Sequence, residues 1–176
     1  HRAMQMFKYS LKIQPNKSEA RKGIGYVFYR LENYDSAITM LENCLALNPK
    51  PNPVFEEVTG ANAIGPFLMQ TTPRTKLGRI HLIKGNLLSS INYFNEEILR
   101  NSSQPDAYDG LGWAYLKQGR AIEARTAFTT AIRLEPLNNS AQNGLVKSKY
   151  TIAEERLKTK MASPFIPPSN KSEVAH

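Results

Sequence analysis

The segment from residue 105 to residue 138 constrains the fold most, because apolar and small residues recur in it at helical spacing in two consecutive runs. The first run places four residues on one stripe of a helix: Tyr108, Leu111, Ala114 and Tyr115. The second run repeats the pattern: Ala124, Phe128, Ala131 and Ile132. Gly119 lies between the runs and tolerates the positive φ with which many helices end. The segment therefore predicts two helices joined by a short turn.

The ends of this segment and its small residues agree with that prediction. Pro105 suits the first turn of a helix, and Pro136 prevents the second helix from continuing. Gly112 and Ala124 are small where two helices must approach closely. The pattern is therefore typical of a tightly packed pair of helices.

These fixed offsets resemble the tetratricopeptide repeat (TPR), a helix–turn–helix unit of about 34 residues. The resemblance is carried by Leu111, Gly112, Tyr115, Gly119, Ala124, Phe128, Ala131 and Pro136. A second copy spans 18–51, with Ile24, Gly25, Phe28, Tyr34, Ala37, Leu41, Cys44, Leu45 and Pro49 at the matching places. A third, degenerate copy spans 71–104, where Leu77, Gly78, Gly85, Phe94 and Ile98 hold their places and Ser90, Glu97, His81 and Ser102 replace family residues. Thr72 before Pro73 is the expected start of its first helix.

The remaining segments complete the predicted organisation. Residues 1–17 match only the second helix of a repeat, so we expect the chain to be a fragment of a longer array. Residues 139–160 predict a closing helix capped by Asn139 or Ser140, with an apolar stripe of Ala141, Leu145, Ile152 and Leu157. Residues 161–176 form a proline-containing tail. The predicted fold is all-α: a right-handed α-α superhelix of about three full repeats, a flanking half repeat and a C-terminal solvating helix.

An insertion at 52–70 separates the first two full repeats and is long for a repeat connection. It contains Phe55, Ile64, Phe67, Leu68 and Met69, which are too apolar for a wholly solvated loop. Two interpretations are open: the insertion folds back over its own helix pair, or it contacts a partner at one end of the groove. We expect it to be the most mobile internal segment.

Bulk properties narrow the class of protein without naming a compartment. The 176 residues carry a net charge of +8, which favours acidic partners in a general way. No apolar run approaches the ~20 residues of a membrane helix. The single cysteine, Cys44, excludes an internal disulfide, and its place in the repeat predicts a small buried residue. We expect a soluble chain, with cytoplasm and periplasm both open.

No constellation of catalytic or metal-binding residues is visible. The histidines, His1, His81 and His176, are far apart and have no ligand neighbours at useful spacing. The acidic pairs, such as Glu56–Glu57, are adjacent in sequence, which is more typical of a solvated face than of acid–base machinery. We therefore predict no enzyme activity, no cofactor and no metal site.

The resemblance implies that ligands lie in a concave groove lined by the first helix of each repeat. The candidate groove residues are Lys22, Tyr26, Tyr29, Arg30, Arg79, Leu82, Asp109, Trp113, Lys117, Lys147 and Tyr150. Aromatic and arginine side chains are frequent in binding hot spots. The alternative is that Trp113 and Tyr26 only pack against neighbouring helices while the basic residues solvate the surface.

The leading functional hypothesis is a non-enzymatic protein-interaction module within a larger scaffold or assembly protein. The residues with which chaperone-binding TPR domains grip a C-terminal carboxylate are mostly replaced here, by Tyr26, Lys76, Asp106 and Gly110, so that specificity is not expected. We expect instead a peptide with acidic and apolar residues, its acid directed toward Arg79. The alternatives are an RNA- or polyanion-binding repeat, against which the scattered basic residues argue, a structural spacer in a bacterial envelope or secretion assembly, and self-association.

Overall fold

The computed structural model describes residues 2–47 and 71–162, and these residues form eight helices and no strand. Their bounds are α1 Arg2–Ile13, α2 Ser18–Arg30, α3 Tyr34–Leu47, α4 Pro73–Ile83, α5 Leu87–Arg100, α6 Pro105–Lys117, α7 Ala121–Leu134 and α8 Asn139–Ala162. The all-α prediction is thereby confirmed for this part of the chain. The predicted insertion at 52–70 and the tail from residue 163 lie outside the described residues.

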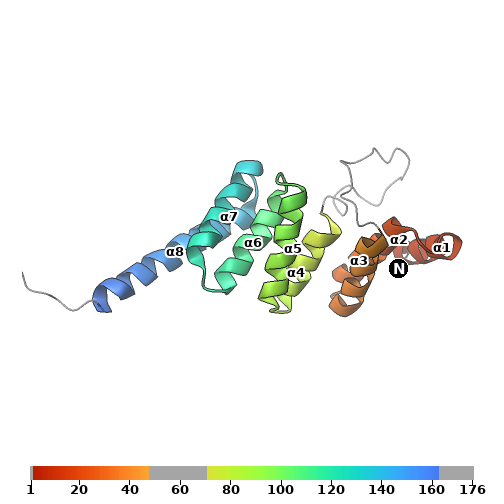
Figure 1. Ribbon diagram of the computed structural model, residues 1–176, viewed down its shortest axis with the longest axis horizontal. Helices are drawn as coiled ribbons and strands as arrows, with labels where there is room; N and C mark the ends of the chain where they lie inside the picture. The colour runs from red at the N-terminus through yellow and green to blue at the C-terminus, as the bar shows by residue number, and fades with distance from the viewer. Residues whose placement is uncertain (1, 48–70, 163–176) are drawn as a thin grey trace, which may run out of the picture.

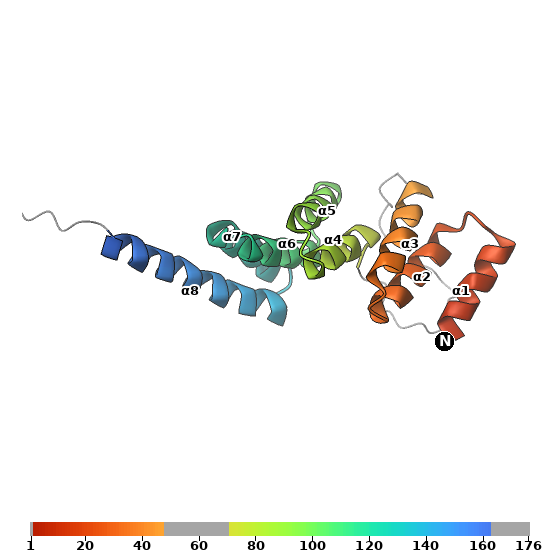
Figure 2. The ribbon, with the colours of Figure 1, turned by 90° about the horizontal axis from the view of Figure 1, so that it is seen from below.

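The helices stack as an elongated row of pairs (Figure 1). The pairs α2–α3, α4–α5 and α6–α7 each pack together, while α1 packs against α2 and α8 against α7. The first helices of successive pairs also touch, α2 with α4, α4 with α6 and α6 with α8. Figure 2 shows α5 above α4, and α8 running along the lower side of α6 and α7. We call the surface formed by α2, α4, α6 and α8 the first-helix face.

An interlock of phenylalanine rings and glycines fixes the distance between helices. A Cβ atom added at Gly112 would lie 2.6 Å from the ring of Phe128, and one at Gly144 only 2.3 Å from it. The ring is thus held between α6 and α8, and Phe128 is fully buried. Side chains at these two glycines would push neighbouring helices apart, because protein interiors are close-packed. The predicted close approach at Gly112 is confirmed.

The N-terminal helices use the same kind of contact. The side chain of Leu41 in α3 lies 2.7 Å from the Cβ position of Gly25, and the ring of Phe7 in α1 lies 2.4 Å from that of Gly23. Phe7 and Gly23 are separated by the same number of residues as Phe128 and Gly144. This agreement supports the interpretation of α1 as a second helix of a repeat.

Cys44 occupies the small, packed position predicted for it. Its side chain is buried in α3 and forms no disulfide. Burial raises the pKa of the Cys44 thiol above its ordinary value, which lowers its thiolate fraction at neutral pH. The thiol is therefore a structural group.

The turns follow the predicted chemistry. Gly85 and Gly119 take φ angles of 79° and 80° after α4 and α6, and the hydroxyl of Thr72 accepts a hydrogen bond from the Thr75 N–H at 3.2 Å to cap α4. The corresponding turn after α2 holds Glu32, whose φ is 58°. An L-residue in this left-handed region is strained, so this turn departs from the pattern of the other two.

The start and the far end of α8 differ from the prediction. Asn138, not Asn139 or Ser140, caps the helix, because its Oδ1 accepts from the Ala141 N–H at 3.0 Å. The helix runs to Ala162 and projects past the N-terminal end of α7 (Figure 1). Leu157 was predicted to continue the apolar stripe but is 60% exposed. The stripe ends early because no helix covers this part of α8 among the described residues.

Candidate functional site

The predicted groove residues all lie on the four helices of the first-helix face. Lys22, Tyr26, Tyr29 and Arg30 belong to α2, Arg79 and Leu82 to α4, Asp109, Trp113 and Lys117 to α6, and Lys147 and Tyr150 to α8. Successive first helices touch, so residues far apart in sequence meet across this face. Their contacts form three groups: a central polar network, and two clusters of aromatic and lysine side chains, one on either side of that network.

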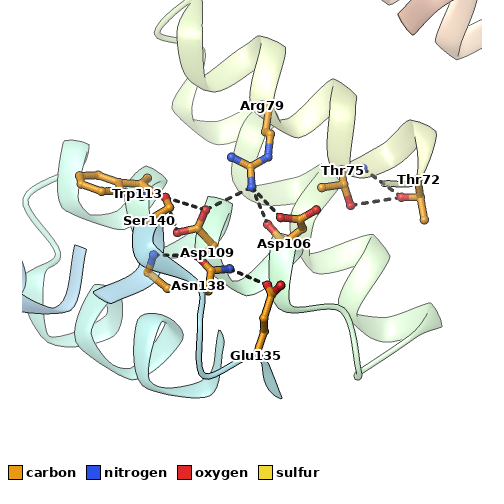
Figure 3. A network of polar contacts seen from close by, with 10 residues as sticks. Thr72, Thr75, Arg79, Asp106, Asp109, Trp113, Glu135, Asn138 and Ser140 are labelled. Carbon is orange, nitrogen blue, oxygen red and sulfur yellow. Dashed lines mark hydrogen bonds and ion pairs between the residues drawn. The ribbon is translucent and has the colours of Figure 1, made fainter. Parts of the chain in front are cut away.

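The central network joins α4, α6 and the start of α8 (Figure 3). One guanidinium nitrogen of Arg79, Nη2, lies 3.1 Å from Asp106 Oδ1 and 3.1 Å from Asp109 Oδ2. The hydroxyl of Ser140 donates to the Asp109 carboxylate, with oxygen–oxygen distances of 2.9 and 3.0 Å. The same hydroxyl accepts a hydrogen bond from Trp113 Nε1 at 3.0 Å. The network therefore orients the indole ring through a chain of bonds that begins at Arg79.

The charge of Arg79 is largely offset inside this network. Asp109 is buried, and burial raises the pKa of its carboxyl group, while Arg79 and the hydrogen bond from Ser140 oppose that rise. Asp106 adds a second, half-exposed carboxylate beside the same guanidinium. A ligand carboxylate at Arg79 would meet two acidic groups already in place. The expectation that a peptide acid points toward Arg79 thus loses its electrostatic basis.

The first aromatic–lysine cluster joins α2 and α4. The ammonium nitrogen of Lys76 lies 4.6 Å from the ring centroid of Tyr29 and 5.8 Å from that of Tyr26. Tyr26 is buried, and its hydroxyl donates to the backbone oxygen of Thr71. Within the described part of the chain, no carboxylate forms an ion pair with Lys76. We call Tyr26, Tyr29 and Lys76 the tyrosine–lysine cluster.

The surroundings of Lys76 lower the pKa of its ammonium group. Burial lowers the pKa of its ammonium group below the ordinary value, and the positive charge of Arg79 lowers it further. The carboxylate of Asp106 opposes this shift, and Arg30 adds a smaller lowering effect. An added negative charge beside Lys76 would favour its charged form. The tyrosine–lysine cluster therefore offers a cation without an ion-pair partner among the described residues.

The second cluster joins α6 and α8. The Lys147 ammonium lies 5.9 Å from the centroid of the Trp113 ring, which meets the Phe128 ring edge-on at 5.3 Å and 74°. Trp113 is half-buried, so part of the indole supports the core while part faces outward. One part of the Trp113 ring thus packs against a neighbouring helix, and another part is exposed and could contact a ligand. We call Trp113 and Lys147 the tryptophan–lysine cluster.

The other predicted residues are less connected. Lys117 reaches back to donate to the Leu82 backbone oxygen at 3.3 Å, which ties α6 to α4. Arg30 and Tyr150 are exposed, Lys22 is half-buried, and no hydrogen bond or ion pair to another predicted groove residue is found for these three among the described contacts. Their role in binding stays a prediction.

Three residues of the site were not among the predicted groove residues: Ser140, and also Lys76 and Asp106, which entered the prediction only as replacements in the carboxylate grip. Lys76 lies three positions before Arg79, a spacing that places both on one side of a helix, so helical periodicity could have found it. Ser140 gave no such signal. It looked like a helix cap, and only the packing of α8 beside α6 brings it to Asp109.

The described residues offer neither a metal site nor a membrane span. No group of three or more His, Cys, Asp or Glu side chains is gathered in residues 2–47 and 71–162 in a way that could hold a metal ion. In the same residues, no helix is long and apolar enough to cross a membrane.

Sequence comparison identifies repeats in two segments. The tetratricopeptide repeat model matches residues 105–138 and residues 23–51. No curated protein matches the chain.

Solved structures with the same fold are distant in sequence. The first TPR of Spaghetti, bound to the HSP90 peptide SRMEEVD, is 22% identical, with a TM-score of 0.64 over 78% of this chain and 94% of that chain. The Sgt2 TPR domain from Aspergillus fumigatus is 17% identical, with a TM-score of 0.65 over 90% and 92%. A MamA protein is 21% identical, with a TM-score of 0.60 over 94% and 87%. The segments 23–51 and 105–138 are thus tetratricopeptide repeats, and the described part of the chain shares the fold of these solved tetratricopeptide-repeat structures.

Proposed function

We propose that the chain is a non-enzymatic protein-interaction module of a larger scaffold or assembly protein, and that it binds a peptide segment of a partner on the first-helix face. The observation that carries this proposal is the pair of aromatic–lysine clusters on either side of a central network in which Arg79 is already paired with two carboxylates. Aromatic groups supply contact area, and the lysines supply charge without a carboxylate partner. The structural relative bound to an HSP90 peptide supports peptide binding by this fold.

The arrangement of charge suggests how a ligand is oriented. We expect an acidic side chain at the tyrosine–lysine cluster, beside Lys76, rather than at Arg79. We expect an apolar side chain against the exposed part of Trp113. Asp106 and Asp109 lie between these places and disfavour an acid in the middle of the ligand.

The peptide specificity of chaperone-binding domains does not carry over. Lys22 matches one residue of the carboxylate grip that the resemblance implies, but Tyr26, Asp106 and Gly110 replace others. The carboxylate of Asp106 stands where a cation would be needed, so it would repel a terminal dicarboxylate. The proposed ligand is therefore an internal segment of a partner protein.

The experiment is selection of binders from a displayed library of random peptides against the immobilised protein, followed by affinity measurement of the selected peptides on variants. Lys76→Glu should lose the acidic peptides, because it replaces the cation by a repelling charge. Trp113→Ala should cost about 2 kcal/mol if the indole is a hot spot. Lys12→Glu on α1 is the matched control, with the same charge change at an exposed position outside the face.

Each variant is first checked for native helicity. If Lys76→Glu, Trp113→Ala and Lys12→Glu all bind the selected peptides as the wild type does, the first-helix face is not the binding site. If affinity falls steeply with salt and single-stranded RNA competes, the polyanion alternative replaces the proposal.

A further inference from the structure

A second surface lies between α7 and the C-terminal half of α8, where two adjoining hollows of about 410 and 480 Å³ share Ile152 and Arg156 as lining residues. The helical period puts these two residues on the side of α8 opposite Lys147, so the surface is separate from the first-helix face. We call it the α7–α8 cleft. The proposed function above does not use it.

Positive charge surrounds the cleft. Its lining includes four cationic side chains, Arg125, Lys149, Arg156 and Lys160, and one acid, Glu155. None of the four cations forms an ion pair within residues 2–47 and 71–162. The rim of the cleft therefore carries an excess of positive charge, and no described residue forms an ion pair with its four cations.

The floor and edges of the cleft are apolar and open. Ile152 is buried at its base, whereas Ile122 and Leu157 are 58% and 60% exposed. Large exposed aliphatic groups beside a hollow are typical of a surface that a partner covers. Apolar contact and positive charge therefore occur together here.

The neighbouring repeat shows what shape of partner the place accommodates. One repeat upstream, the positions of Arg125 and Lys149 are held by Ile91 and Tyr115, which belong to one apolar cluster with Ala127 of α7. There a helix, α7, fills the place. In the α7–α8 cleft, the two equivalent apolar groups are replaced by the cations Arg125 and Lys149.

We propose that the α7–α8 cleft binds an amphipathic helix of a partner protein, with acidic residues flanking its apolar stripe. The helical shape follows from the neighbouring repeat, and the acidic flanks follow from the four unpaired cations. A surface that served solubility alone would not need exposed aliphatic groups among four cations and a single acid.

A second copy of the chain is a poorer occupant than an acidic helix. The exposed apolar side chains of α1, such as Met6 and Tyr9, would suit the floor of the cleft. However, α1 carries Arg2, Lys8 and Lys12 and no acidic residue, so it would be repelled by the rim. The charge balance favours a different protein as the partner.

The test uses a fluorescein-labelled synthetic helix of about 18 residues, or five turns, with leucines on one stripe and glutamates beside it. Its binding to the whole chain is measured by fluorescence anisotropy and by methyl NMR. We expect saturable binding, with methyl shifts concentrated at Ile122, Ile152 and Leu157. Arg125→Glu combined with Arg156→Glu should weaken binding by about tenfold or more, because two attractions become repulsions.

The control Arg133→Glu with Lys158→Glu makes the same change in net charge on the same two helices, outside the cleft lining. It should alter affinity by only about twofold. The same peptide with lysines in place of glutamates should not bind. Methyl shifts at Ile122, Ile152 and Leu157, with none at Leu82 of α4, separate this site from the first-helix face.

Four results would overturn the proposal. The first is an equal loss of peptide affinity in the two double variants, and the second is binding of the lysine peptide. The third is stronger binding of single-stranded RNA than of the acidic helix. The fourth is a dimer, seen in sedimentation, that the cleft double variant disrupts. The last two would assign the surface to a polyanion or to a second copy.

Discussion

The repeats at 71–104 and 105–138 pack their helices in the same way but have different residue types at three equivalent positions. In each, a phenylalanine ring is fully buried between two glycines, Phe94 between Gly78 and Gly110, and Phe128 between Gly112 and Gly144. The helix spacing of both repeats depends on this interlock. The shared feature is therefore steric and apolar.

At these three positions the repeat at 71–104 has polar side chains, whereas the repeat at 105–138 has two alanines and a tyrosine. Ser90 stands for Ala124 and donates from its hydroxyl to the Gly78 backbone oxygen at 2.8 Å. His81 stands for Tyr115, stacks on Tyr93 at 5.4 Å, and burial lowers its pKa. Glu97 stands for Ala131 and is buried.

The comparison teaches that the interlock defines the repeat, while the positions around it accept polar groups. Two of the three find a hydrogen-bond partner, whereas the buried Nδ1 of His81 has none among the described residues. The hydroxyl of Ser90 has one in the backbone. Glu97 has one in Thr72, although burial still raises the pKa of its carboxyl group. Buried polar groups are tolerated when they are hydrogen-bonded.

The largest effect should come from removing the shared feature. Phe94→Ala and Phe128→Ala should each destabilise the chain by about 3–5 kcal/mol, because each leaves a cavity between three helices. The measurement is urea unfolding followed by far-UV circular dichroism. Leu99→Ala, at a position 87% exposed on α5, is the control and should change stability by less than about 0.5 kcal/mol.

Similar costs for the two phenylalanines would confirm a common interlock. A cost below about 1 kcal/mol at Phe94 would show that the degenerate repeat is held by its polar groups instead.

Much of this architecture could be predicted from the sequence, because it depends on local spacing. The helix pairs, the turn at Gly119 and the Thr72 cap follow from residues close together in the chain. The membership of Arg79 and Trp113 in a common face followed from the repeat period. These features need no knowledge of how the helices cross.

The partners of charged groups could not be predicted in the same way. The contact of Arg79 with Asp106 and Asp109 depends on the angle between α4 and α6, and the bond from Ser140 to Asp109 depends on how α8 enters. The sequence predicted Asn139 or Ser140 as the cap of α8, whereas Asn138 takes that role. The hydroxyl of Ser140 instead bonds to Asp109 of α6, a contact that depends on tertiary packing.

The next largest effect should come from the buried carboxyl that distinguishes the earlier repeat. The pKa of Glu97 is raised in the folded chain, so the folded state holds its proton to higher pH than the unfolded state does. Stability is fully present below the unfolded pKa, about 4.3, and is lost as pH rises through the folded pKa. Glu97→Gln, which keeps the shape without ionising, should make this decline shallower.

The measurement is urea unfolding at a series of pH values above 4. The exposed neighbour gives the control, Glu96→Gln, which should leave the pH dependence as it is. Part of the decline should remain in Glu97→Gln, because burial also raises the pKa of Asp109. An unchanged slope would mean that the carboxyl of Glu97 is as well accommodated when charged as when neutral.

The smallest effect concerns the turn that separates the N-terminal pair from the other two. Glu32 has a φ of 58°, at the position where Gly85 and Gly119 have 79° and 80°. Left-handed backbone costs an L-residue about 1–2 kcal/mol, and the greater freedom of glycine in the unfolded chain returns roughly 0.5–1 kcal/mol of any gain. Glu32→Gly should therefore stabilise the chain by about 0.5–1 kcal/mol. The reverse change gives a matched test, because no atom lies within 4 Å of a Cβ placed at Gly119, so Gly119→Ala meets no clash. It therefore reports the same balance of backbone strain and unfolded-state freedom. Thermal unfolding of both variants should move the melting temperature in opposite directions. A loss of stability in Glu32→Gly would show instead that the Glu32 side chain supports its turn through contacts that outweigh the strain.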